Sequence, residues 1–566
     1  MTKLLGTTAG LVGVAIALLA PISPEHYIQQ VLSLFRDKPG YPESDRLRCR
    51  PFLPKQLLVD HPPLTDEPQI RAAADELRRY LDGLQAEGGF ETIAVAVTTA
   101  GGPLLVDTRG TLRANESALE GMVVTPHSQY RIASVAKLFP VFLGWLLQQR
   151  GIISWDDPVK KHIQDLPENG EDITLYDLAT HMSGLGRDWP VGIVQNWPYD
   201  VEGGGAPPYN GHDFPTVEEL LRSVGDTPRV SPAWTEPQYS NTGAGLLGLA
   251  LLEAVRAAGV HHGGAEEPSF ARLMREEVFE LLGMNGSHFL VDEKTAGHVV
   301  VPSFMPEVVD QDFLDAMNPA GGQFSSLHDL VTFAQILLDF SQRDSVITRR
   351  SLDRWLKPVV SFEEDNLTEL GMMWEIIKHR DSNQRLRRVY WKLGLMLAYG
   401  SCFAIHPGSS YGVVVLMTGV FPDAAKICYK AFDIFQPAID AVTADRATDL
   451  YEGKWVSDDG LASATVMLEK GVLYLDRLQF NDTDVLSKFP EQSRLALRPT
   501  GRTDEFRIDV GFPGFNGLPH MGCYTYWNGK DDYGHKNGNA INLISFLGEA
   551  GKRLMNVSSL NSTLHQ

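Results

Sequence analysis

The stretch YRIASVAKLFPVFLGWLLQQ, residues 130–149, combines a strand-like entry, a serine and a lysine three positions apart, and a long apolar run. Positions i and i+3 of a helix share one face, so a helix over 134–149 sets Ser134 beside Lys137. Burial disfavours the charged form of a lysine, and a neutral Lys137 can take the proton of the Ser134 hydroxyl. The pattern therefore predicts a nucleophilic serine at the start of a buried helix, where the helix N-terminus stabilises negative charge on the attacking oxygen.

Two features surround this pair. Residues 130–133 are typical of a strand that leads into a turn, and the apolar residues after Lys137 favour a buried helix. Pro140 lies inside that helix. Because proline has no backbone N–H, we expect it to remove one helical hydrogen bond and to bend the helix axis.

A YSN triplet begins at Tyr239 and can supply a phenolic proton carrier and an amide from one tight loop. Tyr239 can serve as the base in acylation and as the acid for the leaving group if the cations of Lys137 and Lys392 lower its pKa. Asn241 can hold a substrate amide or the lysine. The alternative is a structural turn in which Asn241 or Thr242 caps the helix that follows.

A KLG triplet begins at Lys392, inside the apolar run 390–398. A lysine on an inner strand at the wall of a site supplies positive charge, and Gly394 lets the backbone approach a ligand closely. The alternative is a lysine on an edge strand, where it discourages aggregation.

The order SxxK, YxN, KxG is more specific than any one of the three motifs. In this order the chain resembles the penicillin-recognising serine enzymes, which include class C β-lactamases, serine D,D-peptidases, carboxylesterases of the same fold and related fungal acyltransferases. Further stretches resemble segments of that family: DDPV at 156–159, ITLYDLATHMSGL at 173–185, NPAGGQFSSLHDLVTFAQILL at 318–338, and the strand-like pair within 401–419. The similarity covers residues 68–445.

The resemblance implies an α/β (α+β) fold of the β-lactamase/transpeptidase type, with an antiparallel sheet flanked by helices and an all-helical lobe. The short alternating segments after Leu450 predict in addition a small all-β C-terminal domain. It implies that Ser134 is the nucleophile, Lys137 its activating partner and Tyr239 the shared base and acid. Asn241 would contact the substrate amide, and Lys392 would be an electrostatic anchor.

The walls of the implied site have their own features. By the resemblance, the backbone N–H groups of Ser134 and Leu395 form an oxyanion hole, in which one donor is worth about 3–4 kcal/mol of barrier. Leu393 replaces the threonine that β-lactamases favour, so a hydroxyl that would meet a substrate carboxylate is missing. Leu395 and Met396 make this wall apolar, which favours a neutral ester or acyl group. The aromatic, Gly- and Pro-rich stretch 188–214 is either a lid or wall of the pocket or a surface insertion.

Other candidate motifs are interpreted as structural. The GSSYG stretch at 408–412 matches GxSxG, but β-branched residues follow it where a helix is needed, so it predicts a hairpin tip. His181 is interpreted as a structural residue near the site. His261 and His262 show no metal-ligand pattern, so no metal is expected, and the lack of a P-loop or dinucleotide fingerprint predicts no cofactor.

The chain has 566 residues, enough for two domains, and a formal net charge of −21. An acidic chain repels phosphate, so we expect no nucleic acid as a partner. The resemblance implies a small-molecule acyl substrate. Residues 1–21 are typical of a secretory signal peptide or an N-terminal anchor, with a buried helix as the alternative. Residues 22–66 are predicted to be an extended leader, 67–445 the hydrolase domain, and 446–566 a small β-rich domain.

Asn-x-Ser/Thr triplets support export, either by secretion or with membrane anchoring in the secretory pathway. They begin at Asn115, Asn285, Asn366, Asn481, Asn556 and Asn561. The cysteines are Cys49, Cys402, Cys428 and Cys523, and they form no CxxC pair. One or two disulfides are compatible with an oxidising compartment, and the pairing stays open. We expect Cys402 to be a buried thiol.

Three functions fit these observations. The first is a serine hydrolase or acyltransferase in which an ester, thioester or amide acylates Ser134 and is then hydrolysed or transferred, as in esterase action or tailoring of a secondary metabolite. The second is a catalytically silent relative that binds a ligand or a partner, against which the three intact motifs argue. The third is a true β-lactamase or D,D-peptidase, against which the apolar KLG wall argues.

Overall fold

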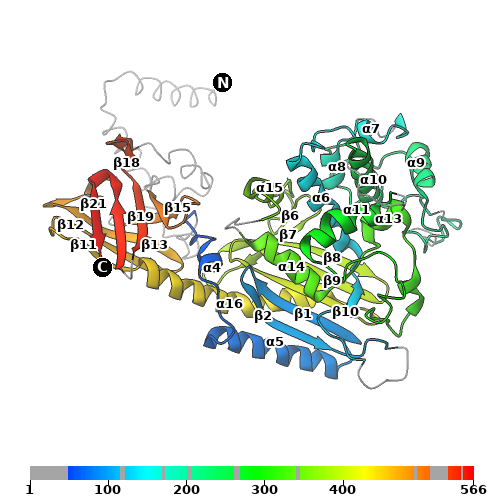
Figure 1. Ribbon diagram of the computed structural model, residues 1–566, viewed down its shortest axis with the longest axis horizontal. Helices are drawn as coiled ribbons and strands as arrows, with labels where there is room; N and C mark the ends of the chain where they lie inside the picture. The colour runs from blue at the N-terminus through cyan, green and yellow to red at the C-terminus, as the bar shows by residue number, and fades with distance from the viewer. Residues whose placement is uncertain are drawn as a thin grey trace, which may run out of the picture. The chain divides into compact units, whose positions relative to one another are not determined.

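The computed structural model describes residues 49–114, 122–168, 172–192, 194–200, 205–259, 268–339, 345–489, 494–509, 533–549 and 552–566 (Figure 1). The chain divides into a larger unit, residues 53–449, and a smaller unit that combines residues up to 52 with residues 450–566. The predicted signal or anchor segment, Asn115, the His261-His262 pair and Cys523 lie outside the described residues. Within the described ranges, no helix has both the length and the apolarity needed to cross a lipid bilayer.

The described part of the larger unit is built on one antiparallel sheet in the order β2-β1-β10-β9-β8-β7-β6-β5. The strands are β1 (Thr92–Thr99), β2 (Gly102–Arg109), β5 (Val360–Ser361), β6 (Thr368–Leu370), β7 (Glu375–Arg380), β8 (Leu386–Met396), β9 (Tyr399–His406) and β10 (Tyr411–Thr418). The GSSYG stretch lies at the tip of the β9–β10 hairpin, so the predicted hairpin is confirmed.

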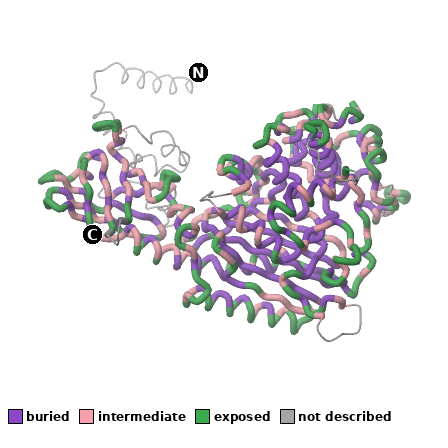
Figure 2. The backbone as a smooth tube through the Cα atoms, in the orientation of Figure 1, coloured by how far each residue is buried: buried purple, intermediate pink, exposed green. Residues whose placement is uncertain are grey.

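Helices cover both faces of this sheet. Helices α5 (Pro68–Ala86) and α16 (Ala424–Tyr451) pack on one face, and α14 (Leu327–Leu338) packs on the other (Figure 1). Figure 2 shows the buried residues as a layer that runs through the sheet. The larger unit therefore has the antiparallel sheet flanked by helices that the sequence predicts.

Strand β1 shows why the sheet needs helices on both faces. Its Ile93, Val95 and Val97 side chains join the core beneath α5 and α16, while Ala94 and Ala96 join the core on the opposite face. Successive side chains of a strand point to opposite faces. An apolar residue at every position therefore needs packing on both sides of the sheet.

The nucleophile segment differs from its predicted form. Residues Ala133–Lys137 form a 3-10 turn, η1, and the α-helix α6 begins only at Leu138 and ends at Gln149. Pro140 is thus the third residue of α6. Backbone N–H groups in the first turn of a helix are the ones that lack a partner within it, so the loss expected for a proline in the helix interior does not arise.

The helical lobe includes α8 (Leu175–Ala179), α10 (Asn241–Ala257) and α13 (Leu314–Gly321). The predicted cap of α10 by Asn241 or Thr242 is wrong. Ser240 is the cap, because its side-chain oxygen accepts a hydrogen bond from the Gly243 N–H at 2.8 Å. Asn241 is instead the first helical residue, which leaves its side chain for another partner.

The smaller unit is all β in its described residues, as the sequence predicts. Strand β11 (Gly453–Ser457) pairs with β12 (Ala462–Glu469) and with the last strand, β21 (Ser562–His565). Strand β12 also pairs with β13 (Val472–Phe480), so the pairing closes into a ring. The Arg498 guanidinium donates to the backbone carbonyl oxygen of Cys49 at 3.0 Å, which ties in a residue from the start of the chain.

Gly394 lies on β8 at the point where this strand passes Ile132, the residue that precedes η1. A Cβ atom at Gly394 would stand 2.2 Å from the carbonyl oxygen of Ile132 and 2.3 Å from Oγ of Ser401. Ser401 Oγ donates to that same carbonyl at 2.7 Å. The glycine is therefore required by packing within the fold, whereas the sequence predicted room for a ligand.

Gly394→Ala should destabilise the larger unit by about 1–3 kcal/mol, the usual cost of an extra methyl in a packed core. Thermal unfolding followed by circular dichroism measures the effect. Gly83→Ala is the matched control, because Gly83 is exposed in α5 and a Cβ there meets nothing within 4 Å. It should be neutral or stabilising by up to about 1 kcal/mol. Equal midpoints for wild type and Gly394→Ala would contradict the packing argument.

Candidate active site

The turn η1 sets Ser134 and Lys137 together. A 3-10 helix has three residues per turn, so side chains at i and i+3 lie one above the other. Lys137 Nζ donates to Ser134 Oγ at 3.2 Å. Lys137 is buried, while Ser134 is partly exposed. The serine is thus open to a substrate, and the lysine contacts it from the protein interior.

Tyr239 is the second partner of the serine. Its hydroxyl donates to Ser134 Oγ at 2.6 Å. The ammonium groups of Lys137 and Lys392 each lie 5.0 Å from the centre of the Tyr239 ring. Burial raises the pKa of Tyr239, but the two nearby cations lower it by a larger amount. The net result is a pKa of about 8. Tyr239 can therefore exchange a proton near neutral pH.

Lys137 is held by acceptors from three elements. Besides Ser134, its ammonium donates to Oδ1 of Asn241 at 2.6 Å and to the carbonyl oxygen of Ala320 at 2.5 Å. Burial lowers the pKa of Lys137; Tyr239 opposes this shift, and the positive charge of Lys392 adds to it. The net lowering makes the neutral amine, the form that can accept a proton, more accessible than in an exposed lysine.

Asn241 is oriented by a carboxylate that none of the three sequence motifs contains. Its Nδ2 donates to Oδ1 of Asp188 at 2.6 Å, which leaves Oδ1 of Asn241 to face Lys137. Asp188 is buried and pairs with Arg187 at 3.2 Å. Their only signal in the sequence is that they follow the HMSGL segment after a single residue, Gly186.

His181 contacts Tyr239 from the side. The two ring centres lie 4.8 Å apart, and Nδ1 of His181 accepts a hydrogen bond from the Ser240 N–H at 3.2 Å. Burial holds the pKa of His181 well below its ordinary value, so the ring stays neutral. These contacts fit the predicted structural role beside the site.

Lys392 lies on β8, an inner strand, so the edge-strand alternative is wrong. Its ammonium donates to Oε1 of Glu375 at 2.5 Å, and Glu375 comes from the neighbouring strand β7. Burial lowers the pKa of Lys392, but Tyr239 and Glu375 raise it more, so Lys392 stays charged. Like Asp188, Glu375 is a site residue that lies outside the three sequence motifs. Leu395, at the end of β8, is 71% exposed.

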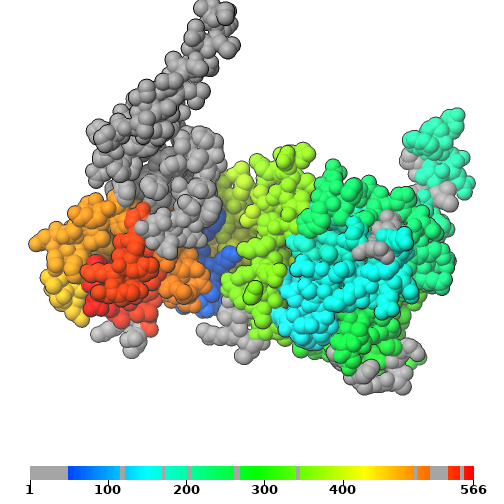
Figure 3. Space-filling model, turned by 90° about the horizontal axis from the view of Figure 1, so that it is seen from above, coloured from blue at the N-terminus to red at the C-terminus, as the bar shows by residue number. Residues whose placement is uncertain are grey.

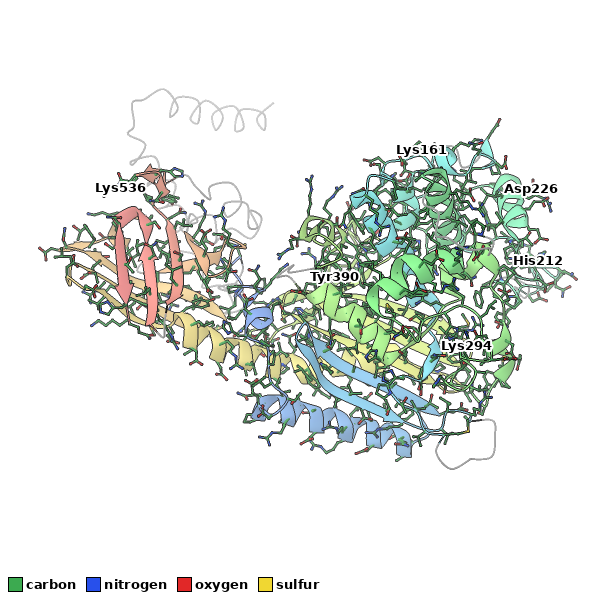
Figure 4. The ribbon with its side chains drawn as sticks, in the orientation of Figure 1. Lys161, His212, Asp226, Lys294, Tyr390 and Lys536 are labelled. Atoms are coloured by element: carbon green, nitrogen blue, oxygen red, sulfur yellow. The ribbon has the colours of Figure 1, made fainter. Side chains whose placement is uncertain are left out.

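The described part of the predicted lid or wall at 188–214 has no helix or strand. Phe214 stacks on Phe313 with ring centres 4.1 Å apart, while Trp197 and Tyr199 are exposed. Figure 3 shows a turquoise stretch projecting from the larger unit, and Figure 4 labels His212 at the edge of that unit. Both ends of the stretch are therefore packed, with Asp188 beside Asn241 at the start and Phe214 at the end, and the exposed part between them fits a surface insertion.

The remaining predicted residues are the sequon asparagines and the cysteines. Asn285, Asn366, Asn481 and Asn561 are exposed, and Asn556 is partly exposed. Cys402 and Cys428 are buried free thiols, as predicted for Cys402, and Cys49 is disulfide-bonded.

Comparison with known proteins identifies the family of this chain. The family model named Beta-lactamase matches residues 77–431, which include the SxxK, YxN and KxG motifs. The chain belongs to the β-lactamase family, a family of serine hydrolases.

Several relatives are similar to this chain. The beta-lactamase-like protein str6 of Strobilurus tenacellus is 34% identical over 288 residues, which span 49% of this chain and 92% of that protein. The D-alanyl-D-alanine-carboxypeptidase/endopeptidase AmpH of Escherichia coli K12 is 25% identical over 295 residues, 51% of this chain and 67% of that protein. A solved class C beta-lactamase shares the fold with a TM-score of 0.50 and 18% identity, covering 65% of this chain and 97% of its own.

The lowered pKa of Tyr239 can be measured directly. The ultraviolet difference between wild type and Tyr239→Phe should titrate as a phenolate with a midpoint near pH 8. When Lys392→Met is added to both wild type and Tyr239→Phe, one cation near the phenol is removed. The midpoint of the Tyr239 titration should then move to higher pH. Tyr80→Phe is the control, because burial raises the pKa of Tyr80 and its difference spectrum should show no transition near pH 8. A Tyr239 midpoint at the ordinary value of 10.0 would refute the electrostatic argument.

Proposed function

We propose that the protein is a serine hydrolase or acyltransferase that forms an acyl-enzyme on Ser134 with an ester, thioester or amide of a small molecule. The observation that carries the proposal is that Ser134 Oγ hydrogen-bonds both Lys137 Nζ, at 3.2 Å, and Tyr239 Oη, at 2.6 Å. Both partners have a lowered pKa, so the serine has an adjacent proton acceptor near neutral pH.

In the proposed acylation step, Ser134 Oγ attacks the acyl carbon while its proton passes to Tyr239 or Lys137. The oxyanion that forms is stabilised by the backbone N–H groups of Ser134 and Leu395, an assignment that rests on the family resemblance. As the acyl–heteroatom bond breaks, Tyr239 returns the proton to the leaving group. Lys392 stabilises the phenolate form of Tyr239 during this exchange.

Deacylation reverses the proton path. Water, an alcohol or an amine attacks the acyl-enzyme, and Tyr239 takes the proton of the attacking group. Ser134 then leaves as an alcohol and recovers its proton. Attack by water gives hydrolysis, and attack by an alcohol or amine gives transfer.

The proposal is tested by the intact mass of the protein after incubation with a fluorophosphonate. Wild type should gain one adduct and Ser134→Ala none. Ser410→Ala, which alters the serine of the GxSxG stretch, should keep the adduct. Tyr239→Phe and Lys137→Ala should each slow labelling by roughly 100-fold or more, the usual contribution of a positioned acid or base.

Two results would change the assignment. Well-folded wild type that takes up no adduct and turns over no p-nitrophenyl ester would favour the silent binding protein. Turnover of a chromogenic cephalosporin would instead favour a true β-lactamase.

We also propose that the protein passes through a eukaryotic secretory route and is secreted, or is held there by its N-terminal segment. The exposed sequons, including Asn285 and Asn366, are accessible to glycosylation, and the disulfide of Cys49 fits an oxidising compartment. Protein from a eukaryotic secretory host should lose mass on treatment with peptide N-glycosidase. An unchanged mass would count against this route.

A further inference from the structure

Lys392 carries a buried cation whose hydrogen bonds are already used within the protein. A lysine ammonium has three N–H donors. It donates to Glu375 Oε1 at 2.5 Å and to the Leu393 carbonyl oxygen at 3.3 Å, and it lies 5.0 Å from the centre of the Tyr239 ring. An anionic group of a substrate would have to compete with these groups for the cation.

The carboxylate is the part of this ion pair that solvent reaches. The Lys392 side chain is 2% exposed, whereas that of Glu375 is 30% exposed. Glu375 is also fixed in place, because its Oε2 accepts a hydrogen bond from the Leu393 N–H at 3.3 Å. An approaching anion therefore meets a held negative charge before it meets the lysine.

The β8 residues that follow Lys392 offer no replacement donor from a side chain, and Arg187, whose guanidinium lies 5.6 Å from the centre of the Tyr239 ring, is paired with Asp188. Leu393 and Leu395 flank Gly394 on β8, and Met396 follows them. Gly321 packs against Phe313 and Met396, since a Cβ at Gly321 would lie 3.7 and 3.8 Å from their side chains. The wall beyond Lys392 is therefore apolar and unsuited to a charged group.

The pair lies on the leaving-group side of the site. Tyr239 returns the proton to the leaving group in the proposed mechanism, and the Lys392 ammonium lies 5.0 Å from the centre of the Tyr239 ring. A carboxylate on the alcohol or amine portion of a substrate would therefore approach Glu375 more closely than one at the far end of the acyl chain.

We propose that Glu375 is a specificity-determining residue that reserves Lys392 for Tyr239 and excludes substrates with a carboxylate on the leaving group. The substrate class is then an ester or thioester with a neutral, apolar leaving group. This inference rests on the proposed acyl-enzyme function.

The test compares two aryl esters that differ in charge: 3-acetylphenyl hexanoate, which is neutral, and 3-carboxyphenyl hexanoate, which is anionic. Wild type should show a kcat/KM for the neutral ester that is roughly tenfold or more above that for the anionic ester, because like charges repel at close range. Glu375→Gln removes the repelling charge and should reduce this preference by roughly tenfold.

Glu76→Gln is the matched control. Glu76 is exposed on α5, so the substitution makes the same change in net charge away from the site. It should leave the preference unchanged, which separates the local effect of Glu375 from the overall negative charge of the protein. Glu375→Asp keeps the carboxylate and should keep most of the preference.

Equal kcat/KM values for the two esters with wild type would overturn the inference without any variant, so a poorly folded Glu375→Gln protein does not block the test. An unchanged preference in folded Glu375→Gln would overturn it as well. Fluorophosphonate labelling of the same preparations distinguishes the two proposals. If Ser134 is labelled but the esters are not discriminated, only the specificity inference fails; if Ser134 is not labelled and no ester is turned over, the proposed function fails.

Discussion

The site depends on the burial of two ammonium groups around one phenol. A charge taken out of water is stable only if it is paired and hydrogen-bonded. Lys137 and Lys392 therefore need acceptors close by, and these come from four elements: η1, α10, α13 and β7. Tyr239 lies between the two cations, and its acidity follows from that position. The electrostatics of the phenol, and with it the reactivity of Ser134, is thus a property of the assembled fold.

The position of Lys392 relative to Lys137 also depends on the tight packing around the start of η1. Strand β8 supplies Lys392 and passes Ile132 so closely that Gly394 can carry no side chain. Ser401, on the next strand, fixes the carbonyl of Ile132 through a hydrogen bond. The contacts that set the distance between the sheet and the turn therefore also set the distance between the two lysines.

Much of this arrangement could be predicted from the sequence because its signals are local. The apolar residues of β1 specify a strand, and the motif order led to a family in which Ser134, Lys137, Tyr239, Asn241 and Lys392 converge, as they do here.

What could not be predicted depends on register and on the exact form of turns. Glu375 reaches Lys392 only because β7 pairs with β8 so that Glu375 lies opposite Trp391. Asp188 reaches Asn241 from an irregular loop, which has no period to detect. The 3-10 form of η1 and the cap at Ser240 are choices between conformations that the same residues allow.

The smaller unit draws residues from both ends of the chain, and this constrains the order of assembly on the ribosome. The partner of the Cys49 carbonyl, Arg498, is made 449 positions later, and β11 pairs with β21 only when the last residues emerge. Residues 53–449 are complete before either partner exists. Because domains generally fold as units during synthesis, the larger unit can fold while the first residues of the smaller unit wait. Cys49 therefore has no Arg498 to contact until translation has passed residue 498.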